Sequence, residues 1–354
     1  MKINLKAGIW KALLLACLVV ASASCVTQEK TASIAEAFES QRAEGFTGYA
    51  IIARKGDIVF SQGAGIADAQ SGALFSETTQ FDIASISKTI TGLLVAEEIA
   101  QGRVKPGARL DAFLDVAGTS LGGVTVQQLL THTGGLVDVV GEDAEIISLQ
   151  DVVKRAAQTP LLHEPGTKYH YSNLGYSLLA AVLEAQSGLS YEEIVMSRLS
   201  AVNARSTGYS RVLDPAKSVR RADGQTIRDL SWGGHSPGGN LIGNGGMIST
   251  PADMARWLLA YRNGTLVSED ARGLARTPYI DETGEGVSYY GYGLVVEEDK
   301  DLGTVFWHNG GSRHFNAHWR ELANQDVIII VLSDQPPAKA DRLALVLQRA
   351  MFEQ

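Results

Sequence analysis

Strand signals stand at the two ends of this chain, and helix signals fill the region between them. Near the N-terminus, residues 48–54 and 57–65 have the pattern of two strands joined by a turn at Lys55-Gly56. Towards the C-terminus, strand signals fall at 289–297, 302–308, 314–321 and 326–333. Residues 327–332 are wholly apolar, which is typical of a central strand covered on both faces. The pattern predicts one antiparallel sheet assembled from both chain ends.

Helices are predicted between and around these strands. They are expected at 31–43, 85–101, 174–187, 191–199 and 338–352, and from Thr250-Pro251 onward. Because the middle of the chain is mainly helical, we expect it to form a lobe inserted into the sheet-bearing part. The predicted fold class is therefore α+β, with a single domain over 26–354. Its α/β lobe covers about 30–105 and 274–354, and its helical lobe about 106–273.

The first 25 residues are typical of an export signal. Three lysines form a basic leader, and residues 12–21 are an apolar run too short to span a bilayer. Ala21-Ser22-Ala23 fits an ordinary signal-peptidase site, whereas Ser22-Ala23-Ser24-Cys25 resembles a bacterial lipobox, in which the cysteine is lipidated. We expect export to the bacterial periplasm or cell envelope, with membrane attachment through a lipid on Cys25.

The composition and net charge limit the kinds of molecule that this protein is expected to bind. Of the 354 residues, 45% are apolar and 20% are charged, which is an ordinary globular composition, and the formal net charge is -8. Removing the leader takes away three lysines and no acids, so the mature chain is more acidic still. This balance argues against nucleic acid as a partner. Both cysteines, Cys17 and Cys25, lie within the first 25 residues, so the mature domain has no internal disulfide.

The segment Ser85-Ile86-Ser87-Lys88 opens the helix predicted at 85–101 and places a hydroxyl and an amine on one helical face. Serine at this position commonly serves only as an N-cap. Lys88, however, would lie at the positive end of the helix dipole, and that field together with burial would lower its pKa towards that of a useful base. A serine alcohol becomes a nucleophile when such a base accepts its proton.

Two further segments extend this candidate site. In Tyr171-Ser172-Asn173, the phenol could relay a proton if a neighbouring cation lowers its pKa, and Asn173 could donate to a substrate carbonyl. The simpler interpretation is a core tyrosine and an asparagine cap. In His308-Asn309-Gly310-Gly311, glycines at a strand end would let a substrate lie close, and the Gly311 N–H could bind an oxyanion together with the Ser85 N–H. The simpler interpretation here is a hairpin turn.

Taken together, the three segments resemble the serine hydrolases of the penicillin-recognising superfamily. This group includes class C β-lactamases, D-alanyl-D-alanine carboxypeptidases, D-aminopeptidases and related esterases. Residues 129–136, LLTHTGGL, and 245–253, GGMISTPAD, resemble two further segments of that family, in the same order. The resemblance covers nearly the whole mature chain and implies a β-lactamase/transpeptidase-like fold. It does not specify a substrate.

The resemblance implies a role for each matching position. Ser85 is expected to be the nucleophile, and Lys88 and Tyr171 to share its proton and later activate water. Asn173 is expected to position substrate, alongside His308 and Gly310 in the strand motif and the N–H groups of Ser85 and Gly311. His132 is expected to be structural, and no cofactor is expected.

His308 departs from the lysine that many β-lactamases carry in the strand motif. A lysine holds a fixed positive charge for a substrate carboxylate, whereas histidine is mostly uncharged at neutral pH. This difference favours uncharged esters or amides over antibiotics, although some carboxypeptidases of the family also carry H-x-G. Arg313 lies close enough in sequence to supply a replacement cation.

Two other motifs in the sequence could indicate a different site. Gly234-His235-Ser236-Pro237-Gly238 matches the G-x-S-x-G pattern, but that motif needs a strand before it and a helix after it, and Pro237 with two glycines predicts a loop. His314 and His318 lie four residues apart in an expected strand, which is not a zinc-binding pattern. We therefore expect no metal.

The sequence thus predicts an exported serine hydrolase that acts on a small ester, amide or peptide through an acyl-Ser85 intermediate. An esterase or a short-peptide or D-peptide hydrolase is favoured, followed by a D-alanyl-D-alanine carboxypeptidase and then a β-lactamase. The alternative from another class is a non-catalytic cell-envelope protein that binds peptides in the same cleft.

Overall fold

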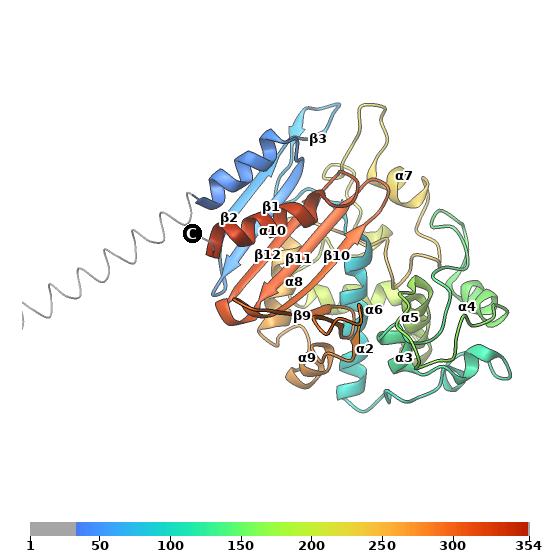
Figure 1. The fold of residues 1–354 in the computed structure, drawn as a ribbon. Helices are drawn as coiled ribbons and strands as arrows, with labels where there is room; N and C mark the ends of the chain where they lie inside the picture. The colour runs from blue at the N-terminus through green and yellow to red at the C-terminus, as the bar shows by residue number, and fades with distance from the viewer. Residues whose placement is uncertain (1–32, 353–354) are drawn as a thin grey trace, which may run out of the picture.

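An antiparallel sheet of eight strands runs through the middle of the computed structural model, which describes residues 33–352 (Figure 1). The strand order is β2-β1-β12-β11-β10-β9-β8-β7. The strands are β1 Gly48–Arg54, β2 Asp57–Ala64, β7 Ile280–Asp281, β8 Ser288–Tyr290, β9 Val295–Asp299, β10 Gly303–Gly311, β11 Asn316–Leu322 and β12 Val327–Ser333. β1 pairs with β12 from Gly48↔Ser333 to Arg54↔Val327. This pairing confirms the predicted sheet built from both chain ends.

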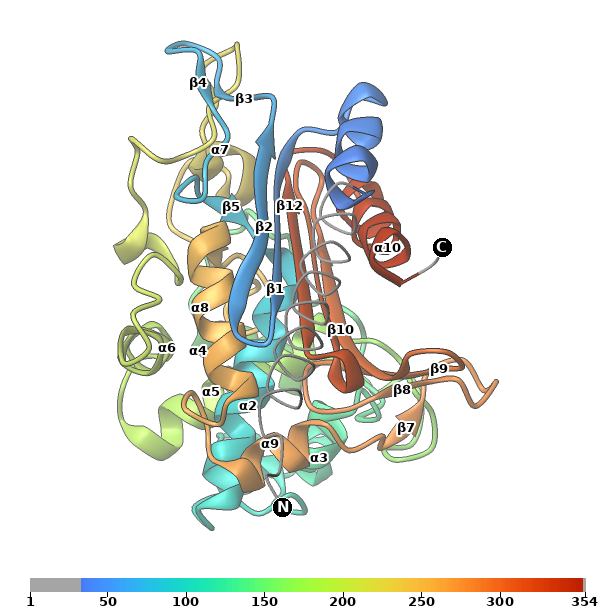
Figure 2. The ribbon, with the colours of Figure 1, turned by 90° about the vertical axis from the view of Figure 1, so that its left-hand side faces the viewer.

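Two helices from opposite ends of the described chain cover one face of the sheet (Figure 2). They are the helix at residues 33–43 and α10, Lys339–Phe352. Their apolar side chains, among them Phe38, Leu343 and Leu347, form a small core with alternate residues of the central strands, such as Ile329. β12 is buried along its whole length, as its uninterrupted apolar sequence predicts.

The other face of the sheet carries a larger core and most of the helices. These helices are α2 Ser87–Ala100, α3 Val126–Leu130, α4 Leu149–Ala157, α5 Asn173–Ser187, α6 Tyr191–Ser200, α7 Ile227–Trp232, α8 Pro251–Arg262 and α9 Glu269–Ala275. Short 3-10 turns accompany them: η1 Ala84–Ile86, η2 Leu110–Ala112, η3 Ser120–Gly123 and η4 Ser210–Val212, with η5 Ala323–Gln325 between β11 and β12. Helices thus flank the sheet on both sides.

Two small strand pairs complete the structure. β3 Ile66–Asp68 pairs with β4 Ala73–Leu74, and β5 Phe81–Asp82 pairs with β6 Ile248–Ser249. The second pair ties the segment that leads into α2 to the segment that leads into α8. Thr250 caps α8 with its side chain and Pro251 follows at the first helical position, as predicted.

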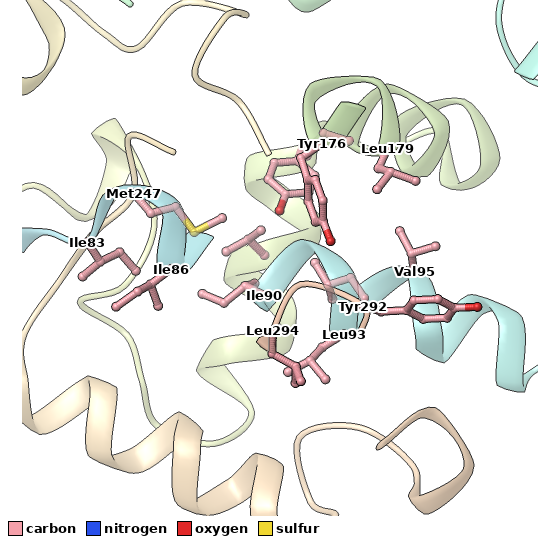
Figure 3. Close-up of a cluster of buried hydrophobic side chains, with 14 of the residues drawn as sticks. Ile83, Ile86, Ile90, Leu93, Val95, Tyr176, Leu179, Met247, Tyr292 and Leu294 are labelled. Carbon is pink, nitrogen blue, oxygen red and sulfur yellow. The ribbon is translucent and has the colours of Figure 1, made fainter. Parts of the chain in front are cut away.

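α2 is buried on nearly every side, which differs from the single apolar stripe that its sequence indicates. Ile90, Leu93 and Val95 point in different directions around its axis and contact residues of neighbouring segments (Figure 3). Polar side chains on its remaining surface are bonded inside the core; Thr89 Oγ1, for example, donates to the Gly293 carbonyl at 2.7 Å. α2 therefore forms the centre of the larger core.

The strand predicted at 289–297 is interrupted. Residues 291–294 form a turn between β8 and β9, closed by the Gly291 N–H donating to Leu294 O at 2.8 Å. Gly293 has a φ of +77°, and a Cβ there would lie 2.1 Å from Lys88 O. The turn therefore packs directly on the first turn of α2, a contact that the local sequence pattern does not reveal.

Gly92 provides a test of this close packing. Alanine normally stabilises a helix interior by about 1 kcal/mol relative to glycine. At Gly92, however, a Cβ would lie 2.3 Å from the carbonyl oxygen of Tyr292. We expect Gly92→Ala to lower the free energy of unfolding by about 1–3 kcal/mol, measured by urea denaturation. Gly273→Ala in α9, where nothing lies within 4 Å, is the control and should be neutral or stabilising. Equal effects of the two changes would contradict this account.

Candidate active site

A strained turn presents Ser85 at the start of α2. Ala84 has a φ of +43°, in the left-handed region that non-glycine residues rarely adopt. Its N–H donates to the buried Asp82 carboxylate at 2.7 Å, and its carbonyl accepts from Ser87 Oγ at 2.7 Å. The sequence suggested that Ser85 is the N-cap of α2, but the structure shows that it is not. It lies inside η1, and the N-cap position falls on Ile86, with no side-chain cap. Its hydroxyl is therefore not used for capping.

Lys88 is fully buried, and its amine contacts three oxygens. Nζ lies 3.1 Å from Ser85 Oγ, 2.6 Å from Asn173 Oδ1 and 2.8 Å from the Asn244 carbonyl. Burial lowers the pKa of Lys88 to about 7, against the opposing effects of Asp138 and Asp143. A neutral amine has two N–H donors and one lone pair. It can donate to Asn173 and Asn244, whose oxygens only accept, and turn its lone pair to the Ser85 hydroxyl.

Tyr171 lies against the same amine, with its ring centroid 4.8 Å from Lys88 Nζ. Burial raises the pKa of the phenol above its ordinary value, and the smaller, opposing effect of the Ser85 side chain does not offset this rise. The sequence left open that a neighbouring cation lowers the pKa of the Tyr171 phenol. The structure shows no such lowering. At neutral pH Tyr171 is a proton-bearing phenol beside Ser85, and Lys88 is the group whose pKa lies near 7.

Asn173 is held in one orientation by a residue that the sequence did not reveal. Asp138 Oδ1 accepts from both the N–H and the side-chain Nδ2 of Asn173, at 3.0 Å each. The amide oxygen is consequently turned towards Lys88. The cap of α5 is Ser172, whose Oγ accepts from Gly175 N–H, so the simpler interpretation of Asn173 as the cap is wrong. A carboxylate two residues after the 129–136 motif was the only available signal for Asp138.

His308 is buried in β10 and uncharged. Its Nδ1 lies 2.6 Å from the Asn309 carbonyl, which makes Nδ1 the proton-bearing nitrogen, and Nε2 accepts from the Tyr290 hydroxyl at 3.0 Å. Burial, with the nearby Lys88, lowers the pKa of His308 to about 3. The strand motif therefore offers a neutral imidazole rather than a fixed cation.

Gly310 brings the end of β10 against the turn that carries Ser85. A Cβ at Gly310 would lie 2.2 Å from Ile83 O and 3.1 Å from Ser85 N, so no larger residue fits there without a shift. Gly311 follows at the exposed end of the strand, beside the same cavities as Ser85. The structure thus brings all seven predicted residues into one region, from η1, α2, the loop before α5, α5 itself and β10.

Two cavities meet at Ser85 and Gly311. The smaller, of about 240 Å³, is lined by aromatic residues and His308, with Glu282 at its wall. The larger, of about 740 Å³, has an acidic wall formed by Asp138, Glu142 and Asp143 and includes Arg313 on the turn after β10. Burial and the two neighbouring carboxylates raise the pKa of Asp143. A third hollow of about 550 Å³, between α4 and α5, contains none of these residues.

The alternative motifs lie elsewhere or lack the required context. Ser236 is in a loop after α7, with no strand before it. His132 is buried, and its Nδ1 accepts from the Ser172 N–H at 3.1 Å, which ties the 129–136 segment to the start of α5. His318 donates to Asp341 on the sheet face that α10 covers, whereas His314 lines the larger cavity. Within residues 33–352, no three His, Cys, Asp or Glu residues are grouped as metal ligands.

No helix among the described residues is both long and apolar enough to cross a membrane. The predicted export signal and Cys25 lie outside the described residues.

Known proteins resemble this chain over most of its length. It is 27% identical to penicillin-binding protein 4* of Bacillus subtilis over 82% of the chain and 68% of that protein. It is 26% identical to protein flp of Staphylococcus aureus over 80% of the chain, but spans only 58% of that protein. The whole relatives are therefore longer than the part this chain matches.

Solved structures share the fold. A penicillin-binding protein from Bacillus halodurans superposes with a TM-score of 0.75 at 24% identity, over 90% of this chain and 99% of that one. An octameric penicillin-binding protein homologue from Pyrococcus abyssi gives a TM-score of 0.76 at 20% identity, over 91% of this chain and 77% of that one. The family model described as Beta-lactamase matches residues 34–350. The chain therefore belongs to the Beta-lactamase family, as its motifs indicated.

Proposed function

We propose that this protein is a serine hydrolase that cleaves esters or amides through an acyl-Ser85 intermediate. The observation that carries the proposal is the fully buried Lys88 amine, 3.1 Å from Ser85 Oγ, with a pKa lowered to about 7. An amine with that pKa is partly neutral under ordinary conditions and can accept a proton. Membership of the family supports the same assignment.

The contacts around Ser85 support a two-step reaction. Ser85 Oγ attacks the substrate carbonyl as Lys88 accepts its proton, and the carbonyl oxygen gains negative charge between the N–H groups of Ser85 and Gly311. The intermediate then collapses, and the leaving alcohol or amine takes a proton that passes through Tyr171. Water next attacks the acyl carbon, gives its proton to the same pair of groups, and releases the acid and free Ser85.

The charges around the cleft favour neutral or cationic substrates. His308 is neutral where a carboxylate-binding cation would stand, and five acidic residues line the larger cavity: Asp82, Asp138, Glu142, Asp143 and Asp229. We therefore place an esterase or a short-peptide or D-peptide hydrolase first. The names of the relatives favour a D-alanyl-D-alanine carboxypeptidase or a β-lactamase as the second candidate, and Arg313 is the cation that would serve either of them.

The non-catalytic alternative is less well supported. A protein that only binds peptides has no need for a buried amine beside a serine hydroxyl, because burying that amine is costly.

We also propose that the protein is exported and anchored to the membrane through Cys25, which rests on the sequence alone.

Covalent labelling of Ser85 tests the proposed nucleophile. We expect a fluorophosphonate to add once to the wild type and not to Ser85→Ala, because the Ser85 hydroxyl lies 3.1 Å from the Lys88 amine that would accept its proton. Intact-protein mass spectrometry measures the adduct, and Ser236→Ala, which should still be labelled, is the matched control. An adduct that persists in Ser85→Ala would transfer the role to Ser236, and a wild type without an adduct would favour the binding protein.

The pH dependence of labelling tests Lys88 as the base. Lys88 is protonated below its pKa and neutral above it, so the rate constant of labelling should rise with pH through about 7. Asp138 favours the ammonium form, so Asp138→Asn should lower the pKa of Lys88 and move this rise to lower pH. The asparagine keeps an oxygen that can accept from Asn173. Asp111→Asn, at a carboxylate paired with Arg109, is the control. A rise moved to higher pH by Asp138→Asn would contradict the assignment.

Substrate charge can be tested with two nitrophenyl esters of equal size, one carrying a trimethylammonium group and the other a carboxylate. The acidic wall should raise kcat/KM for the cationic ester by about tenfold over the anionic one at low salt, with a smaller ratio at high salt. Asp143→Asn should reduce the ratio. Preference for the anionic ester, abolished by Arg313→Gln, would instead support the carboxypeptidase or β-lactamase.

A further inference from the structure

Asn316, at the first position of β11, is almost fully buried and makes four hydrogen bonds with its side-chain amide. Its Nδ2 donates to the Gly310 carbonyl at 2.9 Å and to an Asp341 carboxylate oxygen at 3.2 Å. Its Oδ1 accepts from the backbone N–H groups of Ala340 and Asp341, at 2.6 and 3.3 Å. Two backbone donors fix the oxygen and two acceptors fix the nitrogen, so the orientation of the amide is determined.

The hydrogen bond from Asn316 to Gly310 lies where β10 has a neighbouring strand on one side only. β9 pairs with β10 only as far as Trp307↔Val295, so residues 308–311 have a sheet neighbour on the β11 side alone. The ladder ends at Gly311↔Asn316, and a hairpin follows in which Ser312 N–H donates to Phe315 O. Two successive glycines at such an end have more conformational freedom than any other pair of residues. An additional donor to Gly310 therefore restricts a segment that would otherwise move.

The direction of that bond fixes the direction of the next N–H. In a trans peptide the carbonyl and the following N–H point to opposite sides. The Gly310 carbonyl points to Asn316, so the Gly311 N–H points to the free edge of β10, beside the cavities that Ser85 lines. Gly310 also abuts the turn that carries Ser85. A rotation of this peptide would therefore change where the N–H points relative to Ser85.

The same amide caps α10 from another part of the chain. The first N–H groups of a helix have no partner within it. Ala338, which precedes α10, has no side chain that could accept from them, and the oxygen of Asn316 does so instead. The amide thus joins the start of the C-terminal helix to the end of the strand that bears the glycines.

We propose that Asn316 is a positioning residue that orients the Gly310–Gly311 peptide, so that the Gly311 N–H meets the oxyanion. This inference rests on the proposed hydrolase function. It extends that function by assigning a role to a side chain that does not touch the reacting atoms. It also explains how α10, which lies across the sheet from α2, contributes to the cleft (Figure 2).

A charge-conserving exchange separates this role from helix capping. The double variant Asn316→Asp/Asp341→Asn keeps an oxygen for the N–H groups of α10 and keeps a donor–acceptor pair between positions 316 and 341. It leaves the Gly310 carbonyl without its side-chain donor. The single variant Asp341→Asn is the reference, because it retains Asn316 and its bond to Gly310 while altering the same side-chain network.

Steady-state kinetics of ester hydrolysis is the first test of the proposed role of Asn316. Loss of one oxyanion donor reduces kcat by 10²–10³, and a misdirected donor should cost less. We expect kcat of the double variant to be about tenfold below that of Asp341→Asn, with KM changed by less than about twofold and equal thermal midpoints. Equal kcat values would overturn the proposal. A loss of kcat that follows the thermal midpoint across both variants would also overturn it, in favour of a purely structural role.

The NMR chemical shift of the Gly310 carbonyl is a second test, and it does not depend on catalytic turnover. Glycine labelled with both ¹³C-carbonyl and ¹⁵N restricts an HNCO spectrum to glycine–glycine peptides, and Gly311→Ala identifies the resonance of Gly310–Gly311. The Gly310 carbonyl should move upfield in the double variant and stay in place in Asp341→Asn. An unmoved resonance in both would overturn the inference. A moved resonance in a protein whose wild type neither turns over nor is labelled would support the positioning and contradict the hydrolase.

Discussion

The burial of one amine is the constraint on which the site depends. Lys88 can keep its Nζ beside Ser85 only because α2 is surrounded by protein, and that burial lowers its pKa to about 7. An exposed lysine at the same spacing would hold a proton at neutral pH and could not accept another. The oxygens of Ser85, Asn173 and Asn244 surround the amine, so each of its directions has a defined partner.

That arrangement needs segments distant in the sequence to meet at one place. Asp138 orients Asn173 from the loop after α3, and the turn at Tyr292-Gly293 packs on α2 from the C-terminal part of the chain. The sheet then brings His308 and the glycines of β10 to the other side of the nucleophile. Each contact is modest, but together they fix a turn whose Ala84 is held in an unfavourable conformation.

The charged residues of the cleft lie on different segments of the chain from the proposed catalytic residues. The nucleophile, amine and phenol belong to motifs that resemble a large family with many substrates. The acidic wall comes from the loop that includes Asp138 and Asp143, and Arg313 comes from a hairpin turn. Loops tolerate substitution better than the core that surrounds α2. We therefore propose that the substrate preference of this chain depends on those loops and on the neutral His308.

The sequence by itself determined the class of fold, the positions of the central strands and of several helices, and the identity of the catalytic candidates. β1 and the C-terminal helix were predicted to within a residue, because strand and helix periodicity are local properties. The tertiary structure alone decided that Ser85 is not a cap, that residues 289–297 form two strands, that Asp138 contacts Asn173 and that Asn316 contacts Gly310. Those results depend on which surfaces meet after folding, as do the burial and the pKa of Lys88. A spacing of residues states which groups share a helical face, but only packing determines which of them lose contact with water.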